Sequence, residues 1–255
     1  SMELLIAHAA GAVASFWLGV QLKLGTVVAA SLTGLLGAFI WPKYAAAIYC
    51  GAFVGMSSAY VLNSLWAVLL AASLAALVFH LSSPVFQGYG GKLGTTAFLA
   101  VNLTALMMGV NIPISGNPAP FPLALALVAA VVLGAVGAYT LSIKRGQGAV
   151  IGSAAVALAG GLALPALFPE VGGQLAAALC CGSYLGMSSN KVLPSYHDLS
   201  FAGLIAGLLY LSALDSSNGC GGKLGTIAFV AVIATVGLKT ILASFIKTAE
   251  TPSEG

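Results

Sequence analysis

Long apolar runs alternate along this chain with short clusters of Gly, Pro, Asn and charged residues. A membrane-spanning helix needs about 20 apolar residues. The runs are apolar on all sides and rich in Ala and Leu, which favours helices over the alternating strands of a β-barrel. Ten of them are predicted as membrane helices, the third, eighth and ninth being short: residues 4–20, 24–41, 44–58, 64–82, 93–111, 120–142, 148–168, 171–187, 199–214 and 225–246.

The amino-acid composition also indicates a protein surrounded by lipid. Of 255 residues, 60% are hydrophobic and 6% are charged, against about 25% charged in a soluble domain. The net charge of +3 gives no reason to expect nucleic-acid binding. The first run lacks a basic start, so we predict a membrane helix there and not a cleaved signal peptide. The fold class is therefore an all-α integral membrane protein.

Two segments of the chain recur at an offset of 131 residues. Six of nine positions are identical in the first and eleven of fourteen in the second: Cys50–Ser58 (CGAFVGMSS) matches Cys181–Ser189 (CGSYLGMSS), and Gly88–Val101 (GYGGKLGTTAFLAV) matches Gly219–Val232 (GCGGKLGTIAFVAV). A shorter match, at Gly11 and Gly134, has an offset of 123. Because Lys, Met, Cys and paired Ser recur in register, shared composition does not explain the similarity, and the chain contains an internal repeat.

Each copy of the repeat holds five predicted helices. Since five is odd, the second copy enters the membrane from the opposite side, which makes a 5+5 inverted-topology repeat. We predict repeat one at residues 1–112, a linker at 113–119, repeat two at 120–247 and a disordered tail at 248–255.

The distribution of basic residues predicts the orientation. With ten spans, seven of the nine basic residues share one side with both termini, namely Lys43, Lys92, Lys144, Arg145, Lys191, Lys239 and Lys247. Lys23 and Lys223 lie on the other side. Basic residues in short loops favour the cytoplasm, so both termini are predicted cytoplasmic, in a bacterial inner (plasma) membrane. The expected partners are the lipid bilayer and a small solute, and a homo-oligomer is compatible with the sequence.

The duplicated GGKLGT motif is the first candidate site. It comprises Gly90, Gly91, Lys92 and Thr95 in one copy and Gly221, Gly222, Lys223 and Thr226 in the other. Each copy precedes a helix, whose start offers free N–H groups and about half a positive charge. Glycine allows close approach and Lys adds a full charge, a combination that suits an anion. The two lysines are predicted at the two mouths of one path. The alternative is a tight turn whose Lys reaches the headgroups.

The duplicated GMSS motif is the second candidate, with Ser57 and Ser58 in one copy and Ser188 and Ser189 in the other. One interpretation is that these serines end a short helix inside the membrane and line a polar path. The other is close packing, because Gly51 and Gly55 form a small-xxx-small face on the third helix, and Gly182 and Gly186 form one on the eighth.

The remaining polar residues narrow the function. All six acidic residues fall at the ends of predicted helices or in loops, which disfavours a carboxylate-based cation carrier. His8 and Asn102 are interpreted as partners of neighbouring helices. No catalytic set, metal-ligand spacing or cofactor motif is present in the sequence, so no enzyme activity, metal or cofactor is expected.

We predict a channel or secondary transporter for a small solute, an anion or a neutral polar molecule ahead of a cation, with its path at the interface of the two repeats. The alternative is a non-transporting membrane assembly subunit or a sensor.

Overall fold

A computed structural model describes residues 2–112 and 119–250, with side chains up to 246. Over these residues the chain is helical and has no strand. The α-helices are α1 (Met2–Phe16), α2 (Thr26–Ile40), α3 (Ala45–Gly55), α4 (Leu65–Ser82), α5 (Lys92–Met107), α6 (Phe121–Tyr139), α7 (Ala149–Leu167), α8 (Gly172–Leu185), α9 (Tyr196–Ser212) and α10 (Lys223–Glu250). Single π-helical turns, Trp17–Gln21 and Thr140–Lys144, extend α1 and α6.

Five of the described helical segments are long and apolar enough to cross a membrane. They are Met2–Gln21, Leu65–Ser82, Phe121–Lys144, Ala149–Leu167 and Lys223–Ile246. The helices α3 and α8 have 11 and 14 residues, which corresponds to lengths of about 16 and 21 Å at 1.5 Å per residue. The hydrocarbon core is about 30 Å thick, so neither crosses it alone. The apolar helices thus indicate a membrane protein, while ten complete spans go beyond what these lengths support.

Some helix ends differ from the predicted ones. The helix α3 ends at Gly55, three residues before the predicted end, because the chain turns at the GMSS motif. In the other direction, α10 continues to Glu250 and so enters the segment predicted as a disordered tail. The predicted linker, apart from residue 119, lies outside the described residues.

Local structure recurs at the offsets of the sequence repeat. The two π-helical turns are 123 residues apart, and each is followed by a glycine with positive φ, Gly25 with φ 82° and Gly148 with φ 88°. The helices α4 and α9 begin after Ser64 and Ser195, which are 131 residues apart. Each serine side chain caps its helix by accepting a hydrogen bond from the backbone N–H three residues later. Equivalent sequences therefore form equivalent local structures.

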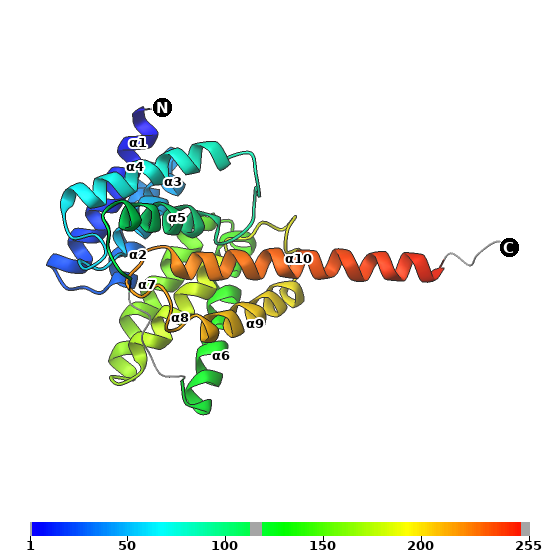
Figure 1. Cartoon of the computed structure of the whole chain (residues 1–255). Coiled ribbons are helices and arrows are strands. Elements are labelled where there is room, and N and C mark those ends of the chain that lie inside the picture. Colours follow the sequence, from blue (N-terminus) through cyan, green and yellow to red (C-terminus); the bar gives the residue numbers. More distant parts are fainter. Residues whose placement is uncertain (1, 113–118, 251–255) are drawn as a thin grey trace.

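Helix contacts also occur in equivalent pairs. The helix α1 contacts α2, α3 and α4, and α6 contacts α7, α8 and α9 in the same way. The group α1–α5 is joined to the group α6–α10 mainly by α2 against α7 and by α5 against α10, with smaller contacts of α2 with α8 and of α3 with α7. In Figure 1, α1, α3 and α4 lie above α6, α8 and α9, and α10 extends far beyond all of them.

Glycines allow the closest of these contacts. A Cβ atom on Gly51 would lie 2.1 Å from the carbonyl oxygen of His8 in α1, and one on Gly182 would lie 1.8 Å from that of Val131 in α6. Neither position has space for a side chain. The predicted small-xxx-small packing is thus confirmed, for α3 against α1 and for α8 against α6.

Candidate solute site at the junction of the two groups of helices

The two duplicated motifs meet crosswise. The hydroxyl of Ser57 accepts a hydrogen bond of 3.0 Å from the N–H of Gly221, and the hydroxyl of Ser188 accepts one of 3.0 Å from the N–H of Gly90. Each hydroxyl also donates to the carbonyl three residues before it, and both serines are fully buried. Ser57 and Ser188 therefore fasten each GMSS turn to the GGKLGT loop of the other repeat, and in this structure they line no open path.

Ser58 and Ser189 extend this crosswise contact through the backbone. The N–H of Ser58 donates to the carbonyl of Gly219 at 2.8 Å, and the N–H of Ser189 donates to that of Gly88 at 2.8 Å. Both side chains are half-buried. The second serine of each motif is therefore more exposed than the first, which is fully buried.

The two GGKLGT motifs also lie against each other. A Cβ atom on Gly91 would lie 2.3 Å from the carbonyl oxygen of Gly225, and one on Gly222 would lie 2.3 Å from that of Gly94. Gly91 and Gly222 have φ of 82° and 85°, which favour glycine. The starts of α5 and α10 therefore meet backbone to backbone. The sequence predicted two separate mouths, whereas the glycines beside the two lysines meet at a single junction.

Each lysine of the motif joins the start of its helix to the end of the preceding one. The ammonium of Lys92 donates to the carbonyl of Ser82, at the end of α4, at 2.6 Å, and also to that of Val85. The ammonium of Lys223 donates to the carbonyl of Leu214 at 3.2 Å and to Asn218 Oδ1 at 3.3 Å. Since an ammonium has three N–H groups, each lysine keeps one for a further partner.

The threonines of the motif have local partners. Thr95 Oγ1 donates to the carbonyl of Gly91, and Thr226 Oγ1 donates to that of Gly222, both at 3.3 Å. Each hydroxyl thus bonds back to the residue before its helix, which fixes the first turns of α5 and α10.

A pocket of about 280 Å³ opens beside the start of α10. Four of the twelve predicted site residues line it, namely Ser58, Gly221, Gly222 and Lys223. The other lining residues are Thr26, Met56, Ala177, Tyr184, Tyr210, Leu214, Asn218, Gly219, Cys220 and Leu224. The remaining eight predicted residues do not line it: Gly90, Gly91, Lys92, Thr95, Thr226, Ser57, Ser188 and Ser189.

The polar side chains that line this pocket are either positively charged or neutral. Lys223, which lines the pocket, is the first residue of α10, where a helix presents free N–H groups and the positive end of its dipole. Ser58 and Asn218 add polar side chains. Asp215 lies close enough to Lys223 to interact electrostatically, but no carboxylate is among the described residues that line the pocket. The pocket therefore suits an anion or a neutral polar molecule.

The equivalent place in the first repeat is occupied by aromatic rings. At the offset of 131, Cys220 corresponds to Tyr89, and Ser217 corresponds to Phe86. The rings of Phe86 and Tyr89 lie 5.2 and 6.4 Å from the ring of Phe229, measured between centroids. Aromatic rings thus stand in the first copy where the second copy has small side chains, of which Cys220 lines the pocket beside α10.

A row of buried polar side chains continues from the pocket into the centre of the molecule. Tyr184, which lines the pocket, accepts a hydrogen bond of 3.0 Å from the thiol of Cys180. Its ring lies 6.1 Å from that of Tyr49, measured between centroids. The hydroxyls of Tyr49 and Ser153 are 3.3 Å apart, and those of Ser153 and Ser183 are 3.0 Å apart. All of these side chains are buried, and they come from α3, α7 and α8.

Sequence analysis did not single out this row, because each member is one polar residue within an apolar run. A usable signal was present in the alignment of the two copies. Tyr184 corresponds to Phe53, Tyr49 to Cys180, and Ser183 to Ala52. Positions where the polarity of the two copies differs thus identify the row.

Two further polar residues form bonds within their own helices. His8 Nδ1 lies 2.9 Å from the carbonyl oxygen of Leu4, and Asn102 Nδ2 donates to that of Phe98 at 2.8 Å. The interpretation of both as links to neighbouring helices is therefore wrong for these contacts. His8 Nε2 is buried and has no hydrogen-bond partner among the described residues.

The fold and this site define an all-helical protein whose apolar helices suit a membrane. Comparison with protein-family models, with curated proteins and with solved structures found no match.

Proposed function

We propose that this protein is a membrane channel or secondary transporter for a small polar solute, with an anion or a neutral molecule favoured over a cation. The pocket beside α10 carries the proposal. It combines the ammonium of Lys223, the start of a helix and a lining without carboxylates, and this environment attracts negative charge and repels cations.

The path would lead from this pocket past Tyr184 and along the hydroxyls of Ser183, Ser153 and Tyr49. These groups lie where helices of the two repeats meet, as expected for transport between inverted repeats. Hydroxyls and a thiol can replace part of the hydration shell of a small solute. Because the row is fully buried, solute passage requires α3, α7 and α8 to separate locally.

Flux measurements in proteoliposomes test the proposal. A panel of small anions, cations and neutral polar solutes should show flux of anions or neutral solutes and rejection of cations. Lys223→Gln should lower anion flux several-fold, and Lys223→Arg should retain more of it because the charge remains. Lys92→Gln is the matched variant outside the pocket and should have the smaller effect. Solute binding without flux for every class would instead favour a sensor or an assembly subunit.

A further inference from the structure

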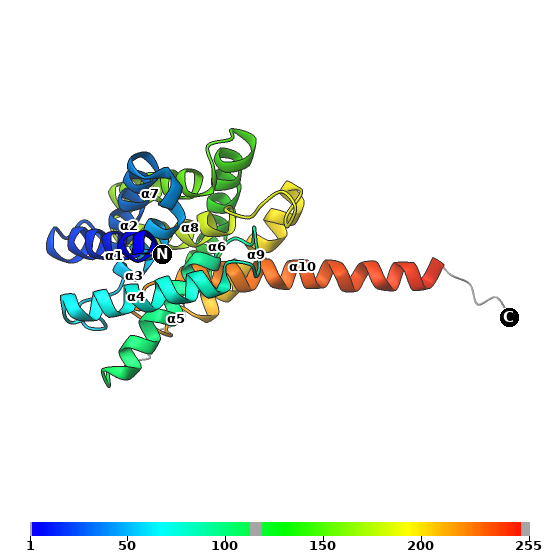
Figure 2. The same ribbon diagram turned by 90° about the horizontal axis from the view of Figure 1, so that it is seen from above.

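A second open site lies where α10 leaves the rest of the molecule. The helix continues alone beyond the others in both views (Figures 1 and 2). At the point of departure, α10 and the segment before α9 enclose a groove of about 530 Å³. Its lining includes Lys191, Val192, Pro194, Val236, Lys239 and Ala243. The segment before α9 thus contributes a lysine and two apolar residues, and α10 likewise contributes Lys239 with Val236 and Ala243.

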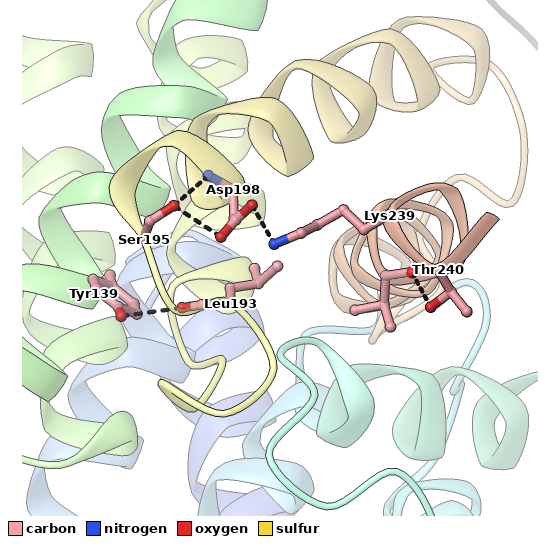
Figure 3. A network of polar contacts seen from close by, with 7 residues as sticks. Tyr139, Leu193, Ser195, Asp198, Lys239 and Thr240 are labelled. Carbon is pink, nitrogen blue, oxygen red and sulfur yellow. Dashed lines mark hydrogen bonds and ion pairs between the residues drawn. The ribbon is translucent and has the colours of Figure 1, made fainter. Parts of the chain in front are cut away.

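The charge of the groove comes from its two lysines. Lys239 extends from α10 towards Asp198 at the start of α9, beside Ser195 (Figure 3), with Nζ 2.6 Å from Asp198 Oδ1. This contact holds the pKa of the Asp198 carboxyl below its usual value. Two N–H groups of Lys239 remain for another acceptor. Lys191 is exposed and has no hydrogen bond or ion pair within residues 2–112 and 119–246. With Asp198 ionised, the groove keeps a net positive charge.

This chemistry is specific to one of the two repeats. At the offset of 131, Lys191 corresponds to Tyr60, Lys239 to Met108, and Asp198 to Ala67. The fold therefore does not require charged residues at these positions. Lys144 lies at the same end of the molecule, because its ammonium is 5.7 Å from the ring centroid of Tyr196, which follows Ser195.

Apolar surface adjoins the groove along α10. Ile241, Leu242 and Phe245 are exposed, at 53%, 61% and 68%, and they follow Lys239 on the part of the helix that leaves the body. At 3.6 residues per turn these three side chains lie on the side of α10 opposite the groove-lining Val236 and Ala243. Lipid can therefore surround this part of the helix, and a groove with apolar walls that opens beside it fits a lipid better than a free anion.

We propose that this groove binds the headgroup of an anionic phospholipid, with the phosphate between Lys191 and Lys239 and the glycerol region on Val192, Pro194 and Val236. Basic pockets beside membrane helices recognise lipid headgroups in this way. The site is separate from the solute pocket, and its test does not depend on transport.

Native mass spectrometry of the full chain in detergent tests the proposal. The probes are dioctanoyl phosphatidylglycerol, dioctanoyl phosphatidylcholine and inorganic phosphate. We expect a discrete phosphatidylglycerol adduct that Lys191→Gln and Lys239→Gln each weaken about fivefold, the effect of one lysine near an anionic membrane surface. Lys239→Arg should retain binding. Lys23→Gln, in an exposed loop outside the groove, is the matched control and should bind like the parent protein.

Three results would overturn the lipid site. The first is unchanged phosphatidylglycerol binding in Lys191→Gln, whose lysine has no structural partner to lose. The second is equal binding of phosphatidylcholine, whose choline group cancels the charge of its phosphate, because binding would then not depend on a net negative headgroup. The third is competition by inorganic phosphate at the same concentration as the lipid, which would indicate a free-anion site.

Discussion

Tyr184 is the residue through which the pocket and the buried polar row are joined. Its hydroxyl accepts from Cys180 at 3.0 Å, while its ring packs on Phe53 at 4.5 Å between centroids. The repeat partner of Tyr184 is Phe53 itself, so the backbone at this position accepts a phenylalanine. At this position, the two copies therefore differ chemically by a single hydroxyl.

The first prediction concerns this hydroxyl. Tyr184→Phe should lower flux of the preferred solute several-fold, because the path loses a polar group. The free energy of unfolding should fall by about 1 kcal/mol, the usual net contribution of one hydrogen bond. Tyr60→Phe is the control, since the Tyr60 hydroxyl bonds to the carbonyl of Asn111 in an exposed place. Parent-like flux in Tyr184→Phe would exclude the row from the path.

At the scale of helices, glycine decides which pairs come into backbone contact. A Cβ atom on Gly55 would lie 2.4 Å from the carbonyl oxygen of Ala12, and one on Gly186 would lie 2.5 Å from that of Ala135. Real Cβ contacts are not this short, and a carbonyl in a helix cannot move alone. These glycines set the distance of α3 from α1 and of α8 from α6.

The second prediction follows from these contacts. Gly55→Leu and Gly186→Leu should each destabilise the protein by about 3 kcal/mol or more, at the upper end for overpacking. Thermal unfolding in detergent measures this. Gly237→Leu is the matched control, because nothing lies within 4 Å of a Cβ there and the repeat partner is Leu106. Equal melting temperatures for all three variants would contradict the packing account.

The sequence predicted the existence and order of the helices well, because membrane helices are long apolar runs with clear interruptions. Their ends were less predictable. The helix α3 stops at Gly55 because Ser57 bonds to Gly221 and Ser58 bonds to Gly219. No local sequence pattern reveals such long-range contacts. For the same reason, both motifs were found but not their crosswise pairing.

At the scale of the whole molecule, equivalent helix contacts surround unequal chemistry. The pocket beside α10 is lined by Cys220 where the first repeat has Tyr89, and the nearby Ser217 corresponds to Phe86. Sequence analysis treated the two GGKLGT motifs as equivalent, whereas the pocket beside α10 is lined by residues of the second motif and by none of the first. The two sites differ because their flanking residues differ. The repeat was recognised from identical residues, which carry no information about this difference.

The third prediction concerns orientation. In a background without native cysteines, Lys23→Cys should react with an impermeant thiol reagent from outside the cell, and Lys43→Cys only from inside. Lys23 and Lys43 are both exposed, so only the membrane decides from which side the reagent reaches each position. Lys191→Cys should behave like Lys43→Cys. Labelling of positions 23 and 43 from the same side would refute the predicted topology.

The most direct test of the solute pocket is to fill it with the side chain that its repeat partner carries. In proteoliposomes, Cys220→Tyr should abolish most of the flux, because the ring would extend into the pocket beside α10 that Cys220 lines. Cys220→Ser should transport like the parent protein. Both variants should unfold at temperatures close to that of the parent. Parent-like flux in a folded Cys220→Tyr protein would contradict the account, since solute would then cross by a route that avoids this pocket.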